Sequence, residues 1–203
     1  ETGLNIIKRF IVKRKFKINN EKNIFYASNT FPLNNNRIYQ LTDSDEISYN
    51  FEKKMIKLLS NINKKVIYKT YPRRNYIDPS PMTKYAKTFD NIKVIDGNFD
   101  FRYINSVGDI FILSSIGISS TVTWLINLKR PVIFLFSNKN KLFTEESINL
   151  MKKIFIFVDR DKHNWEENLK NILNKSFEEL KTTWDDKEVY RDQYDKEWLT
   201  DKN

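Results

Sequence analysis

The sequence predicts an α/β fold: a Rossmann-like parallel sheet with helices on both faces, followed by a helical extension at the C-terminus. Short apolar runs of strand length alternate along the chain with segments of helical spacing, as is typical of parallel sheets built from βαβ units. Residues 109–136, DIFILSSIGISSTVTWLINLKRPVIFLF, contain the plainest of these units. There an apolar run, a turn rich in Ser, Gly and Thr, an apolar stretch of helical length and a second apolar run after Pro131 follow one another.

The strands of this sheet are expected at short runs of apolar and β-branched residues, which favour a buried pleated surface. They are residues 23–27 (NIFYA), 65–69 (KVIYK), 92–95, 110–113, the run after Pro131, and 154–158. The second of these runs ends before Pro72, since proline cannot donate to the sheet ladder.

The helices are expected between these runs. In residues 48–62 the apolar side chains follow helical spacing, and Ser48 is a suitable N-cap. Shorter helices are expected at residues 82–89, 99–107 and 144–152. From about His163 the chain is expected to be helical again, with Trp165, Leu169, Ile172 and Leu173 on one side. We therefore divide the chain into a basic arm or linker at 1–21, a Rossmann-like domain at 22–162, and a helical extension at 163–203 that packs on that domain.

Composition excludes several classes of function. The 203 residues contain no Cys and one His, so disulfides, Cys nucleophiles, His-based metal clusters and a Ser-His-Asp triad are not expected. The four glycines are scattered and do not form G-x-G-x-x-G, which argues against a tightly held NAD or FAD. No apolar run approaches the roughly 20 residues needed to span a bilayer. We expect a metal-independent protein without a cofactor, located in the cytoplasm.

The formal net charge of +9 is unevenly distributed. Residues 8–17 contain six basic side chains and no acidic one. Such a block attracts nucleic acid, an anionic membrane surface or a polyanionic substrate, and it is equally typical of a solvated arm. The chain opens with Glu1-Thr2-Gly3 rather than Met, so we expect a piece of a longer protein.

Two anion-seeking loops follow two of the expected strands. Residues 69–74 (KTYPRR) follow the second strand, and residues 114–121 (SSIGISST) follow the fourth. Ligands of open parallel sheets bind beyond the carboxyl ends of the strands, so we expect the two loops to face each other across one cleft. Arginine can bind a phosphate through two parallel N–H bonds, and a helix that begins in hydroxylated residues offers further donors.

The candidate site residues in these loops are Lys69, Arg73, Arg74, Ser114, Ser115, Ser119, Ser120 and Thr121. Plainer interpretations of the same residues remain open. Arg73 and Arg74 also suit a solvated turn, and residues 119–121 also suit ordinary helix caps.

The order K-x-Y-P-R, then D-I-F-I-L-S-S, then S-S-T-x-x-x-L-x-x-L-x-x-P-V-I-F resembles the C-terminal half of bacterial GT-B glycosyltransferases. More narrowly, it resembles transferases that act in capsule or lipopolysaccharide synthesis. The tail is similar as well, in Asn164-Trp165, Trp184, and the stretch from Arg191 to Tyr194. The similarity covers roughly residues 22–195.

The resemblance implies the donor half of an enzyme that holds a nucleotide sugar and transfers the sugar to a carbohydrate or lipid-linked acceptor. It implies that Lys69 and Arg73 face the donor and that Ser119, Ser120 and Thr121 face its phosphates. It also implies an absent N-terminal acceptor domain that carries the catalytic base. The catalytic residues therefore remain unassigned, because Asp78 and Glu145 are best interpreted as solvated surface residues.

Two departures from the family leave the identity of the donor open. The chain reads Lys69-Thr70-Tyr71-Pro72 where sialyltransferases have Lys-Pro-His-Pro, and it has Trp124 where relatives carry Glu. The alternative function is a basic nucleic-acid-binding module without activity, in which residues 8–17 and exposed tyrosines bind the polymer. The candidate tyrosines are Tyr26, Tyr39, Tyr49, Tyr68 and Tyr71. No nucleic-acid-binding signature is present, so nucleic acid is not the expected partner. The basic arm also suits peripheral attachment to the inner membrane.

Overall fold

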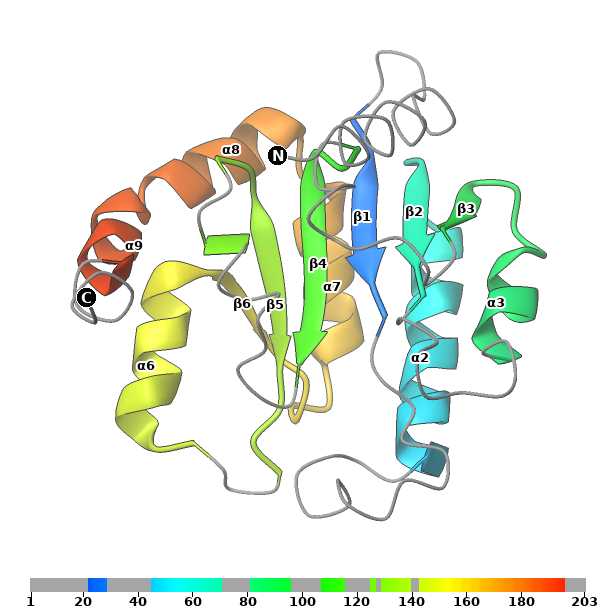
Figure 1. The fold of residues 1–203 in the computed structure, drawn as a ribbon, viewed down its shortest axis with the longest axis horizontal. Coiled ribbons are helices and arrows are strands. Elements are labelled where there is room, and N and C mark those ends of the chain that lie inside the picture. The colour runs from blue at the N-terminus through cyan, green and yellow to red at the C-terminus, as the bar shows by residue number, and fades with distance from the viewer. Residues whose placement is uncertain are drawn as a thin grey trace, which may run out of the picture. The chain divides into compact units, whose positions relative to one another are not determined.

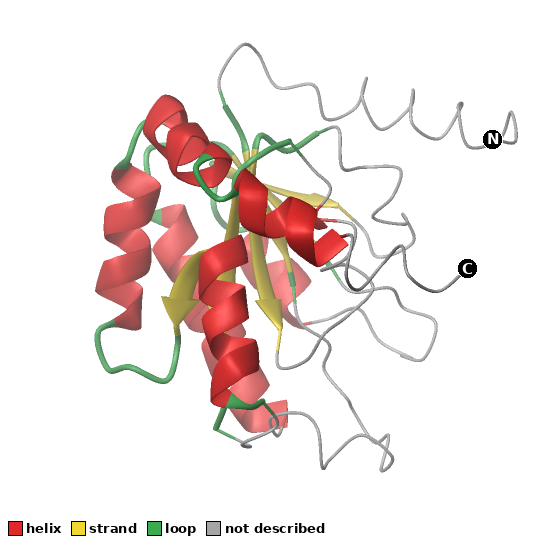
Figure 2. Cartoon of the chain, turned by 90° about the vertical axis from the view of Figure 1, so that its left-hand side faces the viewer, coloured by secondary structure: helices red, strands yellow, loops and turns green. Residues whose placement is uncertain are grey.

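A computed structural model describes residues 22–28, 45–70, 81–95, 107–115, 125–126, 129–139 and 143–195. Its six strands form one sheet in the order β3-β2-β1-β4-β5-β6. The pairs β1–β2, β1–β4, β2–β3 and β5–β6 are all parallel. Helices accompany the strands (Figures 1 and 2). The α/β Rossmann-like fold that the sequence predicts is confirmed.

The chain divides into two compact units, Glu1–Ser114 and Ser115–Asn203. The first contains the strands β1 (Ile24–Ala27), β2 (Val66–Lys69), β3 (Ile92–Ile95) and most of β4 (Ile110–Ser115), with the helices α2 (Asp45–Ser60) and α3 (Pro81–Ala86). The second contains β5 (Val132–Phe136), β6 (Ile156–Asp159) and the helices α6 (Glu145–Ile154), α7 (Trp165–Asn174), α8 (Phe177–Asp185) and α9 (Glu188–Asp195). The predicted boundaries at residues 21 and 162 stay a prediction.

The strands of the first unit form where β-branched and aromatic residues are buried. Neighbouring strands align Phe25 with Phe111, and the two rings lie 5.4 Å apart. Gly108 leads into β4 so close to β1 that an added Cβ would lie 2.5 Å from the Cβ of Phe25. At the same end the Asn23 amide donates to the Asp109 carboxylate at 3.0 Å. These contacts fix the register of β4 against β1.

Helix α2 begins at Asp45, three residues before the expected start, and Ser48 is therefore not its cap. Ser48 is buried inside the helix, at 4% exposure. The first turn instead carries Glu46, whose negative charge suits the positive end of a helix. The apolar spacing was correct from Phe51 onward, and the face that it marks is buried.

In the second unit, β6 begins at Ile156 rather than at residue 154. Ile154 ends α6, and the Phe155 amide donates to the Met151 carbonyl. Because the end of the helix and the strand are both apolar, no pattern in residues 154–158 marks the boundary between them. The other end of α6 follows expectation, since Thr144 caps it and accepts from the Ser147 amide at 3.3 Å.

The helical extension predicted at the C-terminus is present as α7, α8 and α9. Trp165, Leu169 and Leu173 are buried on one side of α7, as expected, and Ile172 is half-buried. A capping box begins α8: the Glu179 amide donates to the Ser176 hydroxyl at 3.1 Å, and the Ser176 amide donates to the Glu179 carboxylate at 2.8 Å.

Three expected elements cannot be compared with the structure. The basic arm at 1–21 lies outside the described residues, and so does the helix at 99–107 apart from residue 107. Of the helix expected between β4 and β5, only Leu125 and Ile126 are described, and both are helical and buried. None of the helices that the structure describes is both long enough and apolar enough to cross a membrane.

Candidate functional site at the carboxyl edge of the sheet

The ends of β2, β1 and β4 lie side by side at one edge of the sheet. The register aligns Ala27 with Lys69 on β2 and with Leu113 on β4. The strand order also runs outward in two directions from the β1–β4 pair. In open α/β sheets such a reversal is where ligands bind, beyond the carboxyl ends of the strands. The fold therefore places the candidate site at the ends of these strands.

One residue beyond Ala27, a row of three hydroxyl groups crosses this edge. When the register is continued by one residue, Ser28, just after β1, lies between Thr70, just after β2, and Ser114 on β4. The Ser28 amide donates to the Lys69 carbonyl at 3.0 Å, so the ladder between β1 and β2 extends to this row. Thr70 and Ser114 are buried, and Ser28 is half-buried. Ser28 is thus the most exposed residue of the row.

Lys69 brings a positive charge to the same edge. Its side chain is only 5% exposed, and its ammonium group donates to the Thr70 carbonyl at 2.9 Å. Successive residues of a strand point to opposite faces, so Lys69 points away from the face that carries Tyr68 and Thr70. An ammonium group held at a sheet edge can bind the oxygen of a phosphate.

A buried carboxylate lies beneath the row of hydroxyls. Glu52 of α2 is fully buried and accepts from the hydroxyls of Tyr26, at 2.6 Å, and of Tyr68, at 2.9 Å. The register places these two tyrosines opposite each other, with ring centroids 5.8 Å apart. Glu52 therefore connects α2 by hydrogen bonds to residues near the ends of β1 and β2.

The environment of Tyr68 favours the protonated phenol. Burial raises the pKa of Tyr68 well above its ordinary value, and the charge of Glu52 and the hydrogen bond to Glu52 raise it further. A hydrogen bond with the Ser28 side chain acts on this pKa in the opposite direction. Tyr68 is therefore held as a neutral phenol beside the buried carboxylate.

The structure describes three of the eight predicted site residues. Lys69 and Ser114 lie at the carboxyl edge, on strands that flank β1, and Ser115 ends β4. Both predicted loops therefore start from the same edge. The other predicted site residues, Arg73, Arg74, Ser119, Ser120 and Thr121, lie outside the described residues. Whether the loops face each other stays a prediction.

The second unit has its own polar cluster at the ends of β5 and β6. The Asp161 carboxylate accepts from the Ser137 hydroxyl at 2.6 Å and from the Asn138 amide at 2.7 Å. Asp159 in turn accepts from the Asp161 amide at 3.1 Å. These bonds join the loops after the two strands, so the acidic residues before His163 have a structural role.

Other candidate residues fall on the surface or in the core. His163 is exposed, and the described part of the chain contains no group of His, Cys, Asp and Glu side chains that could hold a metal ion. Glu145 is exposed in the first turn of α6, whereas Asp78 lies outside the described residues. Tyr26 and Tyr68, at 0% and 1% exposure, cannot stack on bases.

Sequence reasoning missed Ser28 and Glu52. A signal for Glu52 was present, because it lies one residue after Phe51 and four before Ile56, within the apolar face of α2. A carboxylate at such a position requires buried hydrogen-bond donors. Ser28 follows the strand NIFYA in the sequence, but the order of the strands was needed to place it between the two loops.

Two solved structures are similar to this chain. The structure is similar to WaaG, described as a glycosyltransferase involved in lipopolysaccharide biosynthesis, with a TM-score of 0.51 and 12% identity over 91% of this chain and 46% of that one. A second similar structure, from E. coli, is described as trehalose-6-phosphate bound with UDP-2-fluoro glucose; its TM-score is 0.46, at 12% identity over 93% of this chain and 46% of that one.

The chain thus spans less than half the length of either neighbour. No family model and no curated protein matches the sequence. The comparisons establish that the chain shares its fold with part of a solved glycosyltransferase structure.

Proposed function

We propose that this chain is the donor-binding half of a GT-B glycosyltransferase and holds a nucleotide sugar at the carboxyl edge formed by β2, β1 and β4. The observation that carries the proposal is the alignment of Ser28, Lys69, Thr70 and Ser114 at the point where the strand order reverses. The fold shared with part of WaaG supports the class of enzyme.

The proposed roles follow from charge and hydrogen-bonding capacity. Lys69, Arg73 and Arg74 neutralise the phosphates, and Arg73 and Arg74 can each donate two parallel bonds. Ser114 and Ser115 lead into the turn whose hydroxyls, on Ser119, Ser120 and Thr121, complete the phosphate site. Fixed donors of this kind stabilise the departing nucleotide in the transition state of transfer.

The proposal also covers the acceptor of the sugar and the catalytic base that deprotonates it. Glu145 is exposed in the second unit, and Glu52 is buried beneath the edge with two hydroxyls bound to it. Glu52 is not suited to deprotonate an acceptor, and Glu145 is best interpreted as a solvated surface residue, so we expect the base to come from an N-terminal half. A surface polysaccharide or a lipid-linked precursor is the proposed acceptor, at the cytoplasmic side of the inner membrane.

Thermal unfolding in the presence of nucleotides tests the proposal. A ligand that binds only the native state stabilises it by about 2.7 kcal/mol at a hundred times its Kd. We expect UDP, GDP or CMP to raise the melting temperature more than the matching nucleoside, and no transfer activity from the chain alone. No shift with any nucleotide at millimolar concentration, together with a shift by short RNA, would contradict the proposal and favour the nucleic-acid-binding module.

Arg73→Ala tests the role of the basic loop. Losing a charge-assisted hydrogen bond costs about 1.5–3 kcal/mol, so the Kd for the nucleotide should rise roughly ten- to a hundredfold. Lys84→Ala is the matched control, because it removes one positive charge from an exposed position on α3. Isothermal titration calorimetry of both variants distinguishes a specific contact from general electrostatics. Equal Kd values for the two variants would show that Arg73 is a surface residue.

A further inference from the structure

Lysine side chains gather on the outer side of α2 and α3 in the first unit. Lys53, Lys54 and Lys57 are exposed on α2, and Lys84 and Lys87 are exposed on α3 and just after it. The two helices pack against each other (Figure 1). Residues three and four apart lie on one side of a helix, so Lys53 and Lys54 both neighbour Lys57. We call these residues the lysine face.

An aromatic pair connects the two helices within this face. The Lys57 ammonium lies 5.5 Å from the centre of the Phe89 ring. Tyr85 of α3 meets Phe89 edge to face, with ring centroids 5.2 Å apart, and both rings are half-buried. Because Lys57 belongs to α2 and the two rings belong to α3 and the turn after it, the lysines of both helices lie on one surface.

The exposed charge of this unit is mostly of one sign. Among the side chains described in it, the exposed acidic ones are Glu46, at the start of α2, and Asp90, next to Phe89. All the exposed basic side chains described there are lysines. The helices of the second unit differ, because exposed acids accompany their lysines, as Glu167 does on α7 and Glu178 on α8. The high lysine content of the chain therefore does not by itself explain the lysine face.

Exposed apolar side chains extend this surface towards the start of α2. Ile47 is 47% exposed and Tyr49 is 37% exposed. Ile47 lies two turns before Lys54, and Tyr49 lies one turn before Lys53, so each shares a side of the helix with a lysine. Lysines beside exposed apolar and aromatic side chains are typical of helices that lie at the surface of an anionic membrane.

We propose that the lysine face binds the surface of an anionic phospholipid membrane, with Ile47 and Tyr49 among the lipid headgroups. An ammonium group is a compact point charge, so it needs no particular arrangement of phosphates. Nucleic acid is the less suitable polyanion, because both rings of the aromatic pair are half-buried and Lys57 lies against Phe89. Stacking on bases requires accessible ring faces. This inference does not depend on the proposed nucleotide site.

Co-sedimentation with lipid vesicles tests the proposal. The chain should bind vesicles that combine phosphatidylcholine with phosphatidylglycerol, and it should not bind vesicles of phosphatidylcholine alone. Each lysine near an anionic surface strengthens partitioning about fivefold. Lys53→Gln combined with Lys57→Gln should therefore weaken partitioning about ten- to thirtyfold. Added salt should weaken the binding of wild type, because it screens exposed charges.

Lys162→Gln combined with Lys170→Gln is the matched control, because it removes the same charge from exposed positions of the second unit. It should change partitioning by less than about twofold, since charges far from the membrane are screened. Ile47→Ser should weaken partitioning about two- to tenfold through lost apolar contact, whereas Val189→Ser, at an exposed position of α9, should not. Melting curves establish that all the variants are folded.

Several outcomes would overturn the inference. Equal partitioning of the two double variants would show that net charge, or the basic residues at 8–17, attracts the vesicles. Equal binding of wild type to both kinds of vesicle would remove the electrostatic argument. Binding to a short RNA that the α2 double variant weakens, without binding to anionic vesicles, would assign the lysine face to nucleic acid. The α2 double variant should keep the wild-type Kd for nucleotide, so this inference and the proposed function can fail separately.

Discussion

At the scale of single residues, the Asn91 side chain donates hydrogen bonds to carbonyls at the end of a helix and in the turn that follows it. Its Nδ2 lies 3.0 Å from the Leu59 carbonyl and 3.3 Å from the carbonyls of Ile62 and Lys64. The last carbonyls of a helix have no partner within it. A single amide just before β3 therefore satisfies the end of α2 and the turn that leads into β2.

This geometry predicts an order of stabilities at position 91. Asn91→Ala removes the donor and should lower the free energy of unfolding by about 1–3 kcal/mol, because partly buried carbonyls lose their partner. Asn91→Asp keeps the shape but directs a negative charge at the carbonyls, so it should destabilise more than alanine does. Urea unfolding at neutral pH measures both. An aspartate variant as stable as wild type would contradict this account of the turn.

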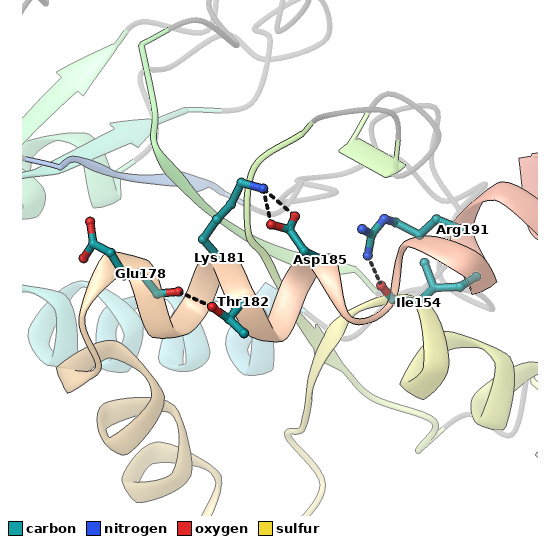
Figure 3. A network of polar contacts seen from close by, with 6 residues as sticks. All are labelled: Ile154, Glu178, Lys181, Thr182, Asp185 and Arg191. Atoms are coloured by element: carbon teal, nitrogen blue, oxygen red, sulfur yellow. Dashed lines mark hydrogen bonds and ion pairs between the residues drawn. The ribbon is translucent and has the colours of Figure 1, made fainter.

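At the scale of elements, the end of α6 is closed by residues from the tail. The Lys187 ammonium donates to the Lys152 carbonyl at 2.7 Å. Arg191 donates to the Ile154 carbonyl at 3.4 Å (Figure 3). The guanidinium of Arg191 also lies 3.8 Å from the centre of the Trp184 ring. Positive groups stabilise the negative end of a helix, so the tail and α6 support each other.

Burial changes the pKa values of the two basic residues that contact the end of α6. It lowers the pKa of Lys187, and the like charge of Arg191 lowers it further. Burial also lowers the pKa of Arg191, against the opposing effect of Glu188 and other nearby acidic residues. Trp184 and Arg191, which belong to the resemblance in the tail, form a stacked pair. Arg191 also donates to the carbonyl at the end of α6.

Arg191→Lys should therefore lower the stability of the protein although it keeps the charge. Lysine cannot reproduce a planar group over the Trp184 ring, and a cation–π contact of this kind is worth about 0.5–2 kcal/mol. Lys187→Arg is the control, because a longer cation can still reach the carbonyls at the end of α6. Thermal unfolding compares the two variants. Equal melting temperatures for Arg191→Lys and wild type would show that the stacking contributes little.

The elements also show what periodicity could and could not predict. The buried strands and the apolar face of α2 were predictable, because burial imposes a period on the sequence. The start of α2 and the boundary between α6 and β6 were not. Ser48 is a residue type that favours N-caps, although it lies buried inside α2. Ile154 is apolar whether it belongs to a helix or a strand. Hydrogen bonds, rather than hydrophobicity, decide such boundaries.

At the scale of the whole molecule, the order of the strands gives the candidate site its meaning. The sequence predicted that Lys69 ends one strand and that Ser114 begins the loop after another; in the structure Lys69 ends β2, but β4 continues through Ser114 to Ser115. The sequence could not reveal that β1 separates those strands or that Ser28 therefore lies between them. Neighbourhood across a sheet depends on topology, which local patterns do not encode. The roles of Arg73, Arg74 and residues 119–121 remain predictions.

Hydrogen exchange with and without a saturating nucleotide measures where the ligand binds, which is the central claim. Peptides that cover residues 69–74 and 114–121 should gain protection, because both loops start from the carboxyl edge. A peptide that covers residues 61–65, in the turn at the amino end of β2, is the internal control and should not change. Protection confined to the amino edge, or to the loops after β5 and β6, would contradict the proposed donor site.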